Sequence, residues 1–276
     1  MQRDRYMSGT KLGGIDFDWL ISTLEVGEIE VGIDEQKYDV ISTFVLGPKA
    51  LWAGEAYVLS LFHLYPAVYL HKTTRGAEKI FSALMKALHS LVVENRGGES
   101  GLPDNHPLLV YLKTMSLGSY LDLDDAVVWG ALPLLADSKD PIVKDAASRL
   151  RCRQLYKAFD VHTSISGGRA GGGGETEQHV RRFTRLLGER IKADQSLVNR
   201  ILFDRFERDP YKQKGYDTPH AIGRIHIMQD GRPIDLAHVS TVVGALRPFE
   251  VYRLYVAPDD DRARKIVEET LAEAKK

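Results

Sequence analysis

Two consecutive helical patterns between residues 50 and 95 constrain the fold more than any other feature. In the first, Val58, Phe62, Tyr65 and Tyr69 recur at spacings of four, three and four, which places them on one helix face. Pro66 should kink or end that helix, because proline lacks the backbone N–H and clashes with the preceding turn. The second pattern carries a broad apolar stripe made by Ile80, Phe81, Leu84, Leu88, Leu91 and Val92. The chain is therefore predicted to be mostly α-helical.

A small β-hairpin is predicted before these helices. Residues 28–33 alternate apolar and polar side chains, as a half-buried strand does. Residues 38–46 are β-branched and apolar and end at Gly47-Pro48, so the two segments can pair around a loop near Asp34-Glu35. Further helices are predicted over 15–24, 108–115 and 125–135, and from an N-terminal cap at Asp140-Pro141, with a short strand over 155–161.

A glycine-rich stretch marks the predicted domain boundary. Residues 164–176 include four consecutive glycines and are predicted to be a flexible linker between a helical domain, 1–163, and a C-terminal region, 177–276. A phosphate-binding P-loop would need lysine and Ser/Thr after its last glycine, and Glu175 follows instead. The C-terminal region combines predicted helices over 178–192 and 259–275 with strands over 222–228 and 249–256. It is therefore predicted to be a small α+β unit.

Charge and composition exclude several classes of protein. The formal net charge of -1 argues against a nonspecific polyanion binder, although a local cationic pocket remains compatible with it. The single cysteine, Cys152, can form neither an internal disulfide nor a Cys/His zinc site. The N-terminal residues contain no apolar signal-peptide region, and no apolar run reaches the roughly 18 residues of a membrane span. A cytoplasmic protein without membrane contact is the expectation.

The densest group of chemically active side chains lies between residues 63 and 75. Tyrosine can stack on a flat ring or donate a hydrogen bond, and lysine and arginine neutralise phosphate charge. This combination suits an anionic ligand that carries a flat ring. An aromatic core stripe with a solvated basic end explains the same spacing and stays open as an alternative. The candidate binding residues in this stretch are Tyr65, Tyr69, His71, Lys72 and Arg75.

The histidines alone predict no metal site. The sequence contains no HExxH motif, and none of its nine histidines precedes an aspartate. Asp122, Asp124 and Asp125 are acidic neighbours, for which a helix N-terminal cap is favoured over metal binding. Neither a metal ligand nor a catalytic residue is therefore assigned from the residues themselves.

Several segments together resemble the HD-domain metal-dependent phosphohydrolases, which include bacterial and animal dNTP triphosphohydrolases. The resemblance spans most of residues 1–256, as the C-terminal portion of such an enzyme, and its first two blocks are the more specific. The segments that carry it are Asp4-Arg5-Tyr6 with Gly9 and residues 14–21, then Tyr69-Leu-His71-Lys72-Thr-Thr, then residues 121–125 with Trp129, and residues 151–157.

The resemblance implies a partial HD-type helical core and a hydrolase that uses metal-activated water. It implies a divalent metal such as Mg²⁺ or Mn²⁺, whose ligands would all precede the matched region and are absent from this chain. By position, Asp4 would touch the substrate sugar, Tyr69 would line the nucleoside pocket, and His71 and Lys72 would approach the phosphates. Leu61 stands where the dNTP hydrolases carry a phosphate-binding arginine, which puts the triphosphate preference in doubt.

Three functions are compatible with these features. The first is a nucleotide phosphohydrolase that lacks its metal-ligand segment and is inactive alone, and the second is a non-catalytic nucleotide-binding or assembly subunit. The third, a nucleic-acid binder, rests only on arginines of the 178–192 helix and is disfavoured. The expected partners are a nucleotide or phosphoester and either a second copy or the missing segment. Without that segment, apolar positions such as Val58, Phe62 and Leu84 are expected to be exposed.

Overall fold

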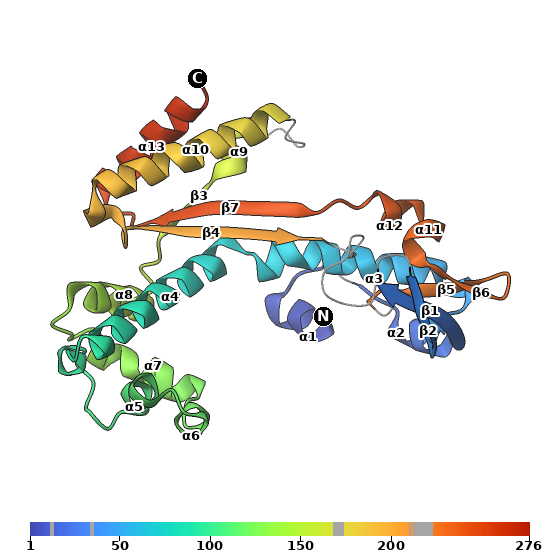
Figure 1. Ribbon diagram of the computed structural model, residues 1–276, viewed down its shortest axis with the longest axis horizontal. Helices are drawn as coiled ribbons and strands as arrows, with labels where there is room; N and C mark the ends of the chain where they lie inside the picture. The colour runs from blue at the N-terminus through green and yellow to red at the C-terminus, as the bar shows by residue number, and fades with distance from the viewer. Residues whose placement is uncertain (12–13, 34–35, 168–173, 210, 212–222) are drawn as a thin grey trace. The chain divides into compact units, whose positions relative to one another are not determined.

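The chain forms two compact units, each built from segments distant in the sequence. A computed structural model describes residues 1–276 except 12–13, 34–35, 168–173, 210 and 212–222. The first unit comprises Met1–His71 and Glu207–Glu250, and the second comprises Lys72–Phe206 and Val251–Lys276. The helices and strands are coloured along the chain in Figure 1. Helices dominate both the length and the packing, so the predicted mostly α-helical fold with small β elements is confirmed.

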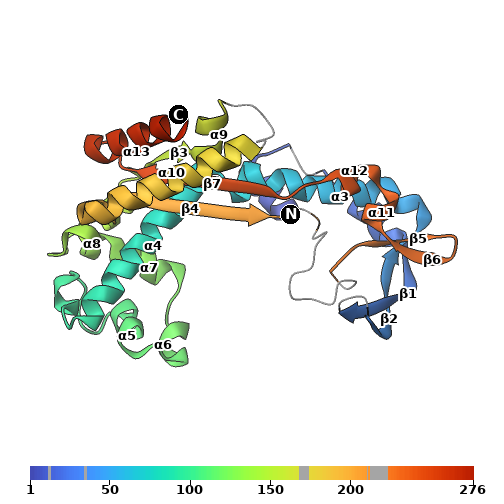
Figure 2. The ribbon, with the colours of Figure 1, turned by 45° about the horizontal axis from the view of Figure 1, so that its top comes forward.

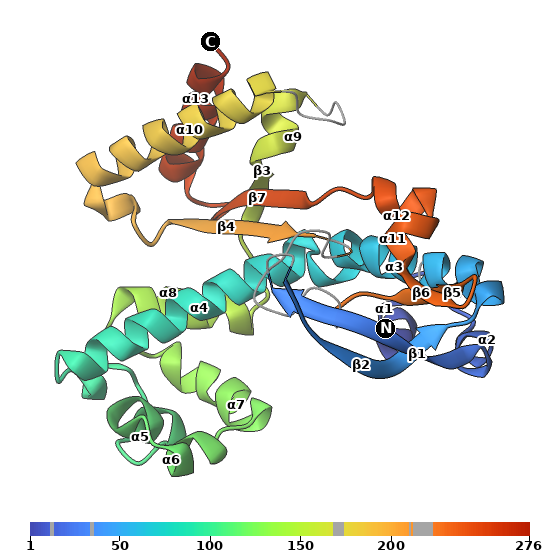
Figure 3. The ribbon, with the colours of Figure 1, turned by 45° about the vertical axis from the view of Figure 1, so that its right-hand side comes forward.

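The first unit packs α3 against a four-stranded sheet. Its elements are α1 (Gln2–Ser8), α2 (Phe17–Ser22), β1 (Leu24–Ile33), β2 (Gln36–Leu46), η1 (Pro48–Ala50), α3 (Leu51–Leu64), η2 (Tyr65–Tyr69), β5 (His226–Gln229), β6 (Arg232–Asp235), α11 (Leu236–Val239) and α12 (Thr241–Ala245). The strands lie in the order β1-β2-β5-β6. The predicted hairpin is present as β1 and β2, with Val26 opposite Phe44, and its loop at 34–35 lies outside the described residues. Figure 3 shows β1 and β2 side by side.

The second unit contains two hydrophobic cores. Its elements are α4 (Lys72–Val93), η3 (Gly97–Glu99), α5 (Pro107–Thr114), α6 (Leu117–Leu121), α7 (Asp125–Leu135), α8 (Pro141–Arg151), β3 (Lys157–Asp160), α9 (Val161–Ser166), α10 (Gly174–Ala193), η4 (Gln195–Leu197), β4 (Ile201–Arg208), β7 (Phe249–Val256) and α13 (Asp261–Ala274). One core joins α4, α5, α7 and α8 through buried leucines, alanines and valines. The other joins α10 and α13 to the sheet β3-β7-β4. Figure 2 shows α10 and α13 lying close together.

Local sequence signals explain several element boundaries. Asp140 caps α8, because its carboxylate accepts hydrogen bonds from the N–H groups of Ile142 and Val143, both at 3.0 Å, and Pro141 is the first helical residue. The predicted strand over 249–256 and the predicted helix over 125–135 have the bounds of β7 and α7. The bounds of these segments could be predicted from the sequence because periodicity and helix caps depend only on neighbouring residues.

The predicted linker at 164–176 is wrong at both ends. Residues 164–166 belong to α9 and residues 174–176 to α10, whose first turn carries Glu175 and Glu177, where acidic side chains favour the helix dipole. Residues 168–173 lie outside the described part of the chain. The boundaries between the two units also differ from those of the predicted domains 1–163 and 177–276. Residues 207–250 belong to the first unit, whereas β4 and β7, the strands on either side of this segment, are neighbours in one sheet.

The expectation that Val58, Phe62 and Leu84 are exposed is also wrong for two of these three residues. Val58 and Leu84 are buried inside their own units, and Phe62 is half-buried. Side chains on β1, β2 and α3 are exposed instead, among them Val26, Phe44 and Trp52. Within the described residues, no helix is long and apolar enough to cross a membrane.

Candidate ligand-binding site around Tyr69

Two tyrosines lie together because the chain widens into a π-helical turn after α3. The Leu70 N–H donates to the Tyr65 carbonyl at 2.7 Å, which is the five-residue spacing of a π-turn. Pro66 sits at the start of this turn, as expected for a residue that cannot continue the hydrogen bonding of α3. The rings of Tyr65 and Tyr69 meet edge to face, with centroids 5.2 Å apart. The π-turn at the predicted interruption of the helix thus also brings the rings of Tyr65 and Tyr69 into contact.

Asp4, in α1 at the N-terminal end of the same unit, contacts this tyrosine pair. The Tyr69 hydroxyl donates to Asp4 Oδ2 at 2.7 Å, and Arg3 donates to Asp4 Oδ1 at 3.0 and 3.1 Å. The hydrogen bond from Tyr69, followed by that from Arg3, holds the pKa of Asp4 below its usual range. Burial, followed by the bond to Asp4, raises the pKa of Tyr69 to about 12. At neutral pH the pair is therefore a carboxylate and a neutral phenol.

Arg208 completes the group, and no sequence motif pointed to it. Its guanidinium carbon lies 4.6 Å from the centroid of the Tyr65 ring, within cation–π distance. Among the described residues, nothing accepts a hydrogen bond from its buried Nε. Arg208 ends β4, whose last two residues, Glu207 and Arg208, belong to the first unit. It lies far along the chain from Tyr65, and a strand arginine carries no spacing signal that would link it to η2. The structure thus adds a cation to the aromatic pair.

The other predicted binding residues are divided between the two units. His71 follows the π-turn in the first unit and is exposed, and Lys72 begins α4 of the second unit. Arg75, in the second unit, donates to Asp204 from Nε at 2.9 Å and pairs with Glu78 at 2.6 Å. Hydrogen bonding to Asp204 raises the pKa of Arg75. Within the first unit, the structure gathers Asp4, Tyr65 and Tyr69, whereas the guanidinium of Arg75 is engaged by carboxylates.

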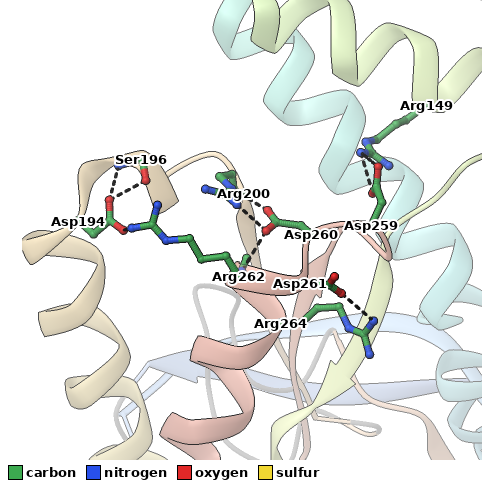
Figure 4. A network of polar contacts seen from close by, with 10 residues as sticks. Arg149, Asp194, Ser196, Arg200, Asp259, Asp260, Asp261, Arg262 and Arg264 are labelled. Atoms are coloured by element: carbon green, nitrogen blue, oxygen red, sulfur yellow. Dashed lines mark hydrogen bonds and ion pairs between the residues drawn. The ribbon is translucent and has the colours of Figure 1, made fainter.

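The second unit contains a charged cavity that does not make an anion site. It encloses about 480 Å³ next to the start of α13 and is lined by arginines and aspartates. Figure 4 shows its pairs: Arg149 with Asp259 at 3.0 Å, Arg200 with Asp260 at 2.6 Å, and Arg262 with Asp194. Because each guanidinium already has a carboxylate, the network joins α13 to the rest of its unit and offers no unpaired cation.

The described residues do not fit the divalent metal that the resemblance implies. In the part of the chain that the structure describes, no group of three or more His, Cys, Asp or Glu side chains could hold a metal ion. Of the acidic residues at 122–125, Asp124 caps α7 by accepting from the Val127 N–H at 2.7 Å, as predicted for a helix cap. No metal ligand is therefore assigned among the residues that the structure describes.

Comparisons with known proteins indicate the fold. No family model matches the chain. An uncharacterised Bacillus subtilis protein, YwfO, is 24% identical over 162 residues, which are 59% of this chain and 34% of that protein. A solved Bacteroides thetaiotaomicron phosphohydrolase matches 92% of this chain and 59% of its own, at 18% identity and a TM-score of 0.62. A hypothetical protein from Aquifex aeolicus matches 99% of this chain and 55% of its own, at 21% identity and a TM-score of 0.56. The chain thus spans a third to three-fifths of these proteins and shares its fold with a solved phosphohydrolase.

Proposed function

We propose that this chain forms the nucleotide-binding part of a phosphohydrolase. The observation that carries the proposal is the group made by Asp4, Tyr69, Tyr65 and Arg208, in which a carboxylate, two aromatic rings and a cation meet within one unit. The fold shared with a solved phosphohydrolase supports the phosphohydrolase part of the proposal. A nucleotide offers a matching set of groups, because it combines a flat base, a sugar with hydroxyl donors and an anionic phosphate.

Each side chain has a role that follows from its chemistry. Asp4 stays ionised at neutral pH and can accept a hydrogen bond from a sugar hydroxyl, while the Tyr69 hydroxyl holds the carboxylate in place. The tyrosine rings supply a surface for the sugar and base. Arg208 supplies positive charge for phosphate, and the exposed His71 lies two residues after Tyr69 in the same unit. Together, these side chains are expected to bind a nucleotide and to orient it.

The hydrolytic step is not assigned to these residues. A divalent metal supplies activated water in the family that the sequence resembles. Because the described residues gather no ligand set for such an ion, we expect the chain by itself to release neither nucleoside nor phosphate from dNTPs with Mg²⁺ or Mn²⁺. Turnover at ordinary enzyme rates would contradict this assignment of roles.

Calorimetric titration of the intact chain with dNTPs tests the binding. Arg208→Gln is expected to weaken binding about tenfold or more, because a charge-assisted hydrogen bond contributes roughly 1.5–3 kcal/mol. The matched control is Arg232→Gln, which removes an exposed arginine from β6 of the same unit and should leave the affinity unchanged. An unchanged affinity in a folded Arg208→Gln protein, or the absence of dNTP binding by the intact chain, would refute the proposed site.

A second candidate function is a non-catalytic nucleotide-binding or assembly subunit. The lack of a metal-ligand group among the described residues favours it over a self-sufficient enzyme. The two candidates differ in one outcome: adding the polypeptide that holds the metal ligands should restore hydrolysis for an enzyme part, whereas a pure binding subunit stays inactive in every combination.

A further inference from the structure

The hairpin of β1 and β2 has one covered face and one exposed face. Because side chains alternate across a strand, Gly27 and Val45 share the covered face, where a Cβ on Gly27 would lie 2.8 Å from Pro233 Cγ of β6. Val26 and Phe44 lie opposite each other on the other face and are 69% and 73% exposed. We refer to the face that carries Val26 and Phe44 as the outer face of the hairpin.

The outer face opens into an apolar pocket of about 310 Å³ at the end next to α2. The apolar side chains that line it come from α2, β1, β2 and α3 and are Leu20, Ile21, Leu24, Phe44, Leu46 and Tyr57. Of the described residues, none that is proposed to bind a nucleotide lines this pocket. A pocket of this kind suits one bulky apolar side chain, the type of anchor that dominates the binding energy of protein interfaces.

Two basic side chains reach the pocket, but neither gives it a net positive charge. Arg224 donates from Nη1 to Asp235 Oδ2 at 2.7 Å, so a carboxylate balances its guanidinium. Burial lowers the pKa of His226, so its imidazole is neutral at pH 7. The pocket therefore offers an anionic ligand no uncompensated cation.

The sequence around the pocket is strongly acidic. Residues 14–50, which include α2, β1, β2 and η1, contain eight acidic residues and two basic ones, Lys37 and Lys49, although the formal net charge of the whole chain is only -1. Two of the acidic residues, Glu28 and Glu30, are exposed on the outer face. They continue the row that Leu24 and Val26 begin along β1, with steps of about 7 Å between alternate residues.

We infer that the outer face binds an extended, basic segment of a partner protein, which inserts a large apolar side chain into the pocket and places Lys or Arg opposite Glu28 and Glu30. Alternate residues of an extended segment are also about 7 Å apart, so two apolar residues followed by two basic ones match the row on β1. The apolar anchor supplies most of the affinity, and the charges fix the register. This inference is independent of the proposed nucleotide site.

The acidic row argues against other occupants of the outer face. A second copy bound through the same face would bring two acidic rows into one interface without a matching row of basic side chains. Nucleic acid and anionic lipid headgroups carry negative charge and would be repelled by Glu28 and Glu30. Charge complementarity therefore selects a basic partner.

Fluorescence anisotropy of a labelled peptide titrated with the intact chain tests this inference. The probe is Lys-Thr-Lys-Thr-Val-Thr-Leu-Thr-Val-Thr-Lys-Thr-Lys, which carries the proposed pattern in both chain directions. The chain is expected to bind this probe about tenfold or more tightly than a scrambled peptide of the same composition, because the ordered peptide fills the pocket and faces the acidic row together. No binding by the folded chain, or equal affinity for both peptides, would overturn the inference.

Two variants separate the apolar and the charged parts of the surface. Phe44→Thr removes a wall of the pocket, keeps a residue suited to a strand, and should weaken probe binding about tenfold. The control is Phe203→Thr, which removes a phenylalanine of β4 that is 41% exposed. Glu28→Lys should weaken probe binding about tenfold and strengthen binding of a peptide with Glu in place of Lys, whereas Glu268→Lys on α13 should do neither. Equal effects at the outer face and at the control positions would refute the proposed surface.

Sedimentation velocity over a concentration series distinguishes a partner protein from a second copy. Phe44→Thr is expected to leave the sedimentation coefficient unchanged at every concentration, because the outer face does not join two copies of the chain. A dimer that dissociates in the Phe44→Thr variant would assign the outer face to a second copy and would contradict the inference.

Discussion

At the scale of single residues, the polar contacts that matter most join positions far apart in the sequence. The Tyr69 hydroxyl reaches Asp4, and Arg75 with Lys79 reaches Asp204, a carboxylate that is fully buried on β4. A buried carboxylate without such partners would give up its charge. These contacts set the protonation states on which the proposed site and the second unit depend.

The Asp4–Tyr69 bond predicts a measurable change in titration. Asp4→Asn should lower the pKa of Tyr69 from about 12 towards its usual 10, although burial will retain part of the shift. Because the folded pKa is raised, the stability that this phenol contributes is complete below pH 10 and is lost as the pH rises through about 12. Tyrosine-selective NMR titration measures it, and Asp18→Asn, an exposed aspartate on α2, is the control. A Tyr69 pKa near 10 in the unaltered chain would contradict the model of the site.

Replacing Asp204 should destabilise the second unit. Burial alone would raise the pKa of Asp204, but hydrogen bonds from Arg75 and Lys79 outweigh it and hold the pKa below its usual range. Asp204→Asn leaves those cations without their anion and is expected to cost about 3 kcal/mol in the free energy of unfolding. The lowered pKa means that this stability is present above the usual carboxylate range and is lost as the pH falls through the folded value.

Urea unfolding at neutral and acid pH measures both effects of Asp204→Asn. The matched control is Asp261→Asn, because the side chain of Asp261 is 96% exposed and should contribute almost nothing. If both variants lose the same stability, the buried pair does not carry the predicted energy.

At the scale of elements, the boundaries follow local signals, but the contacts between elements depend on close backbone approach. Gly101, in the loop between α4 and α5, has φ +87, and a Cβ there would lie 2.2 Å from the Leu134 carbonyl oxygen at the end of α7. Only glycine adopts this conformation readily and also leaves room for that carbonyl. The loop can therefore lie directly against α7.

Gly101→Ala is expected to destabilise the helical core by about 2–4 kcal/mol. The substitution adds backbone strain at positive φ and a steric clash with Leu134, each of which costs about 1–3 kcal/mol. Thermal and urea unfolding measure the loss. Gly98→Ala provides the comparison, because that glycine has open space around it and should change stability little. Equal stability of the two variants would contradict the close approach.

At the scale of the whole molecule, each hydrophobic core lies inside one unit. The cores of the second unit draw on residues 80–150 and 161–274, and the core of the first unit draws on Leu46, Val58, Ile227 and their neighbours. Residues 207–250 are the part of the sequence that leaves the second unit after β4, contributes to the first unit, and returns at β7, the neighbour of β4 in the sheet. The chain thus passes between the units twice in this region, but the two units have separate hydrophobic cores.

This organisation predicts that the second unit folds alone. A protein in which residues 72–206 are joined by an Asn-Gly turn to residues 251–276 keeps both of its cores, and the drawn directions of β4 and β7 are opposite, as a hairpin needs (Figure 1). Circular dichroism should show a helical protein that melts cooperatively. A chain without a cooperative transition would show that the second unit needs the first.

The sequence by itself determined where most elements lie, since helical stripes, strand alternation and caps are properties of neighbouring residues. It predicted the helices at 125–135 and after Asp140, the hairpin, and the placement of Tyr65 and Tyr69 on one face of a helix. Only the tertiary structure decided that Arg208 stacks on Tyr65, that Arg75 is engaged by Asp204, and that α7 leaves one apolar face uncovered. The physical reason is that periodicity records which side chains share a face, whereas the partner of that face is set by packing between distant segments.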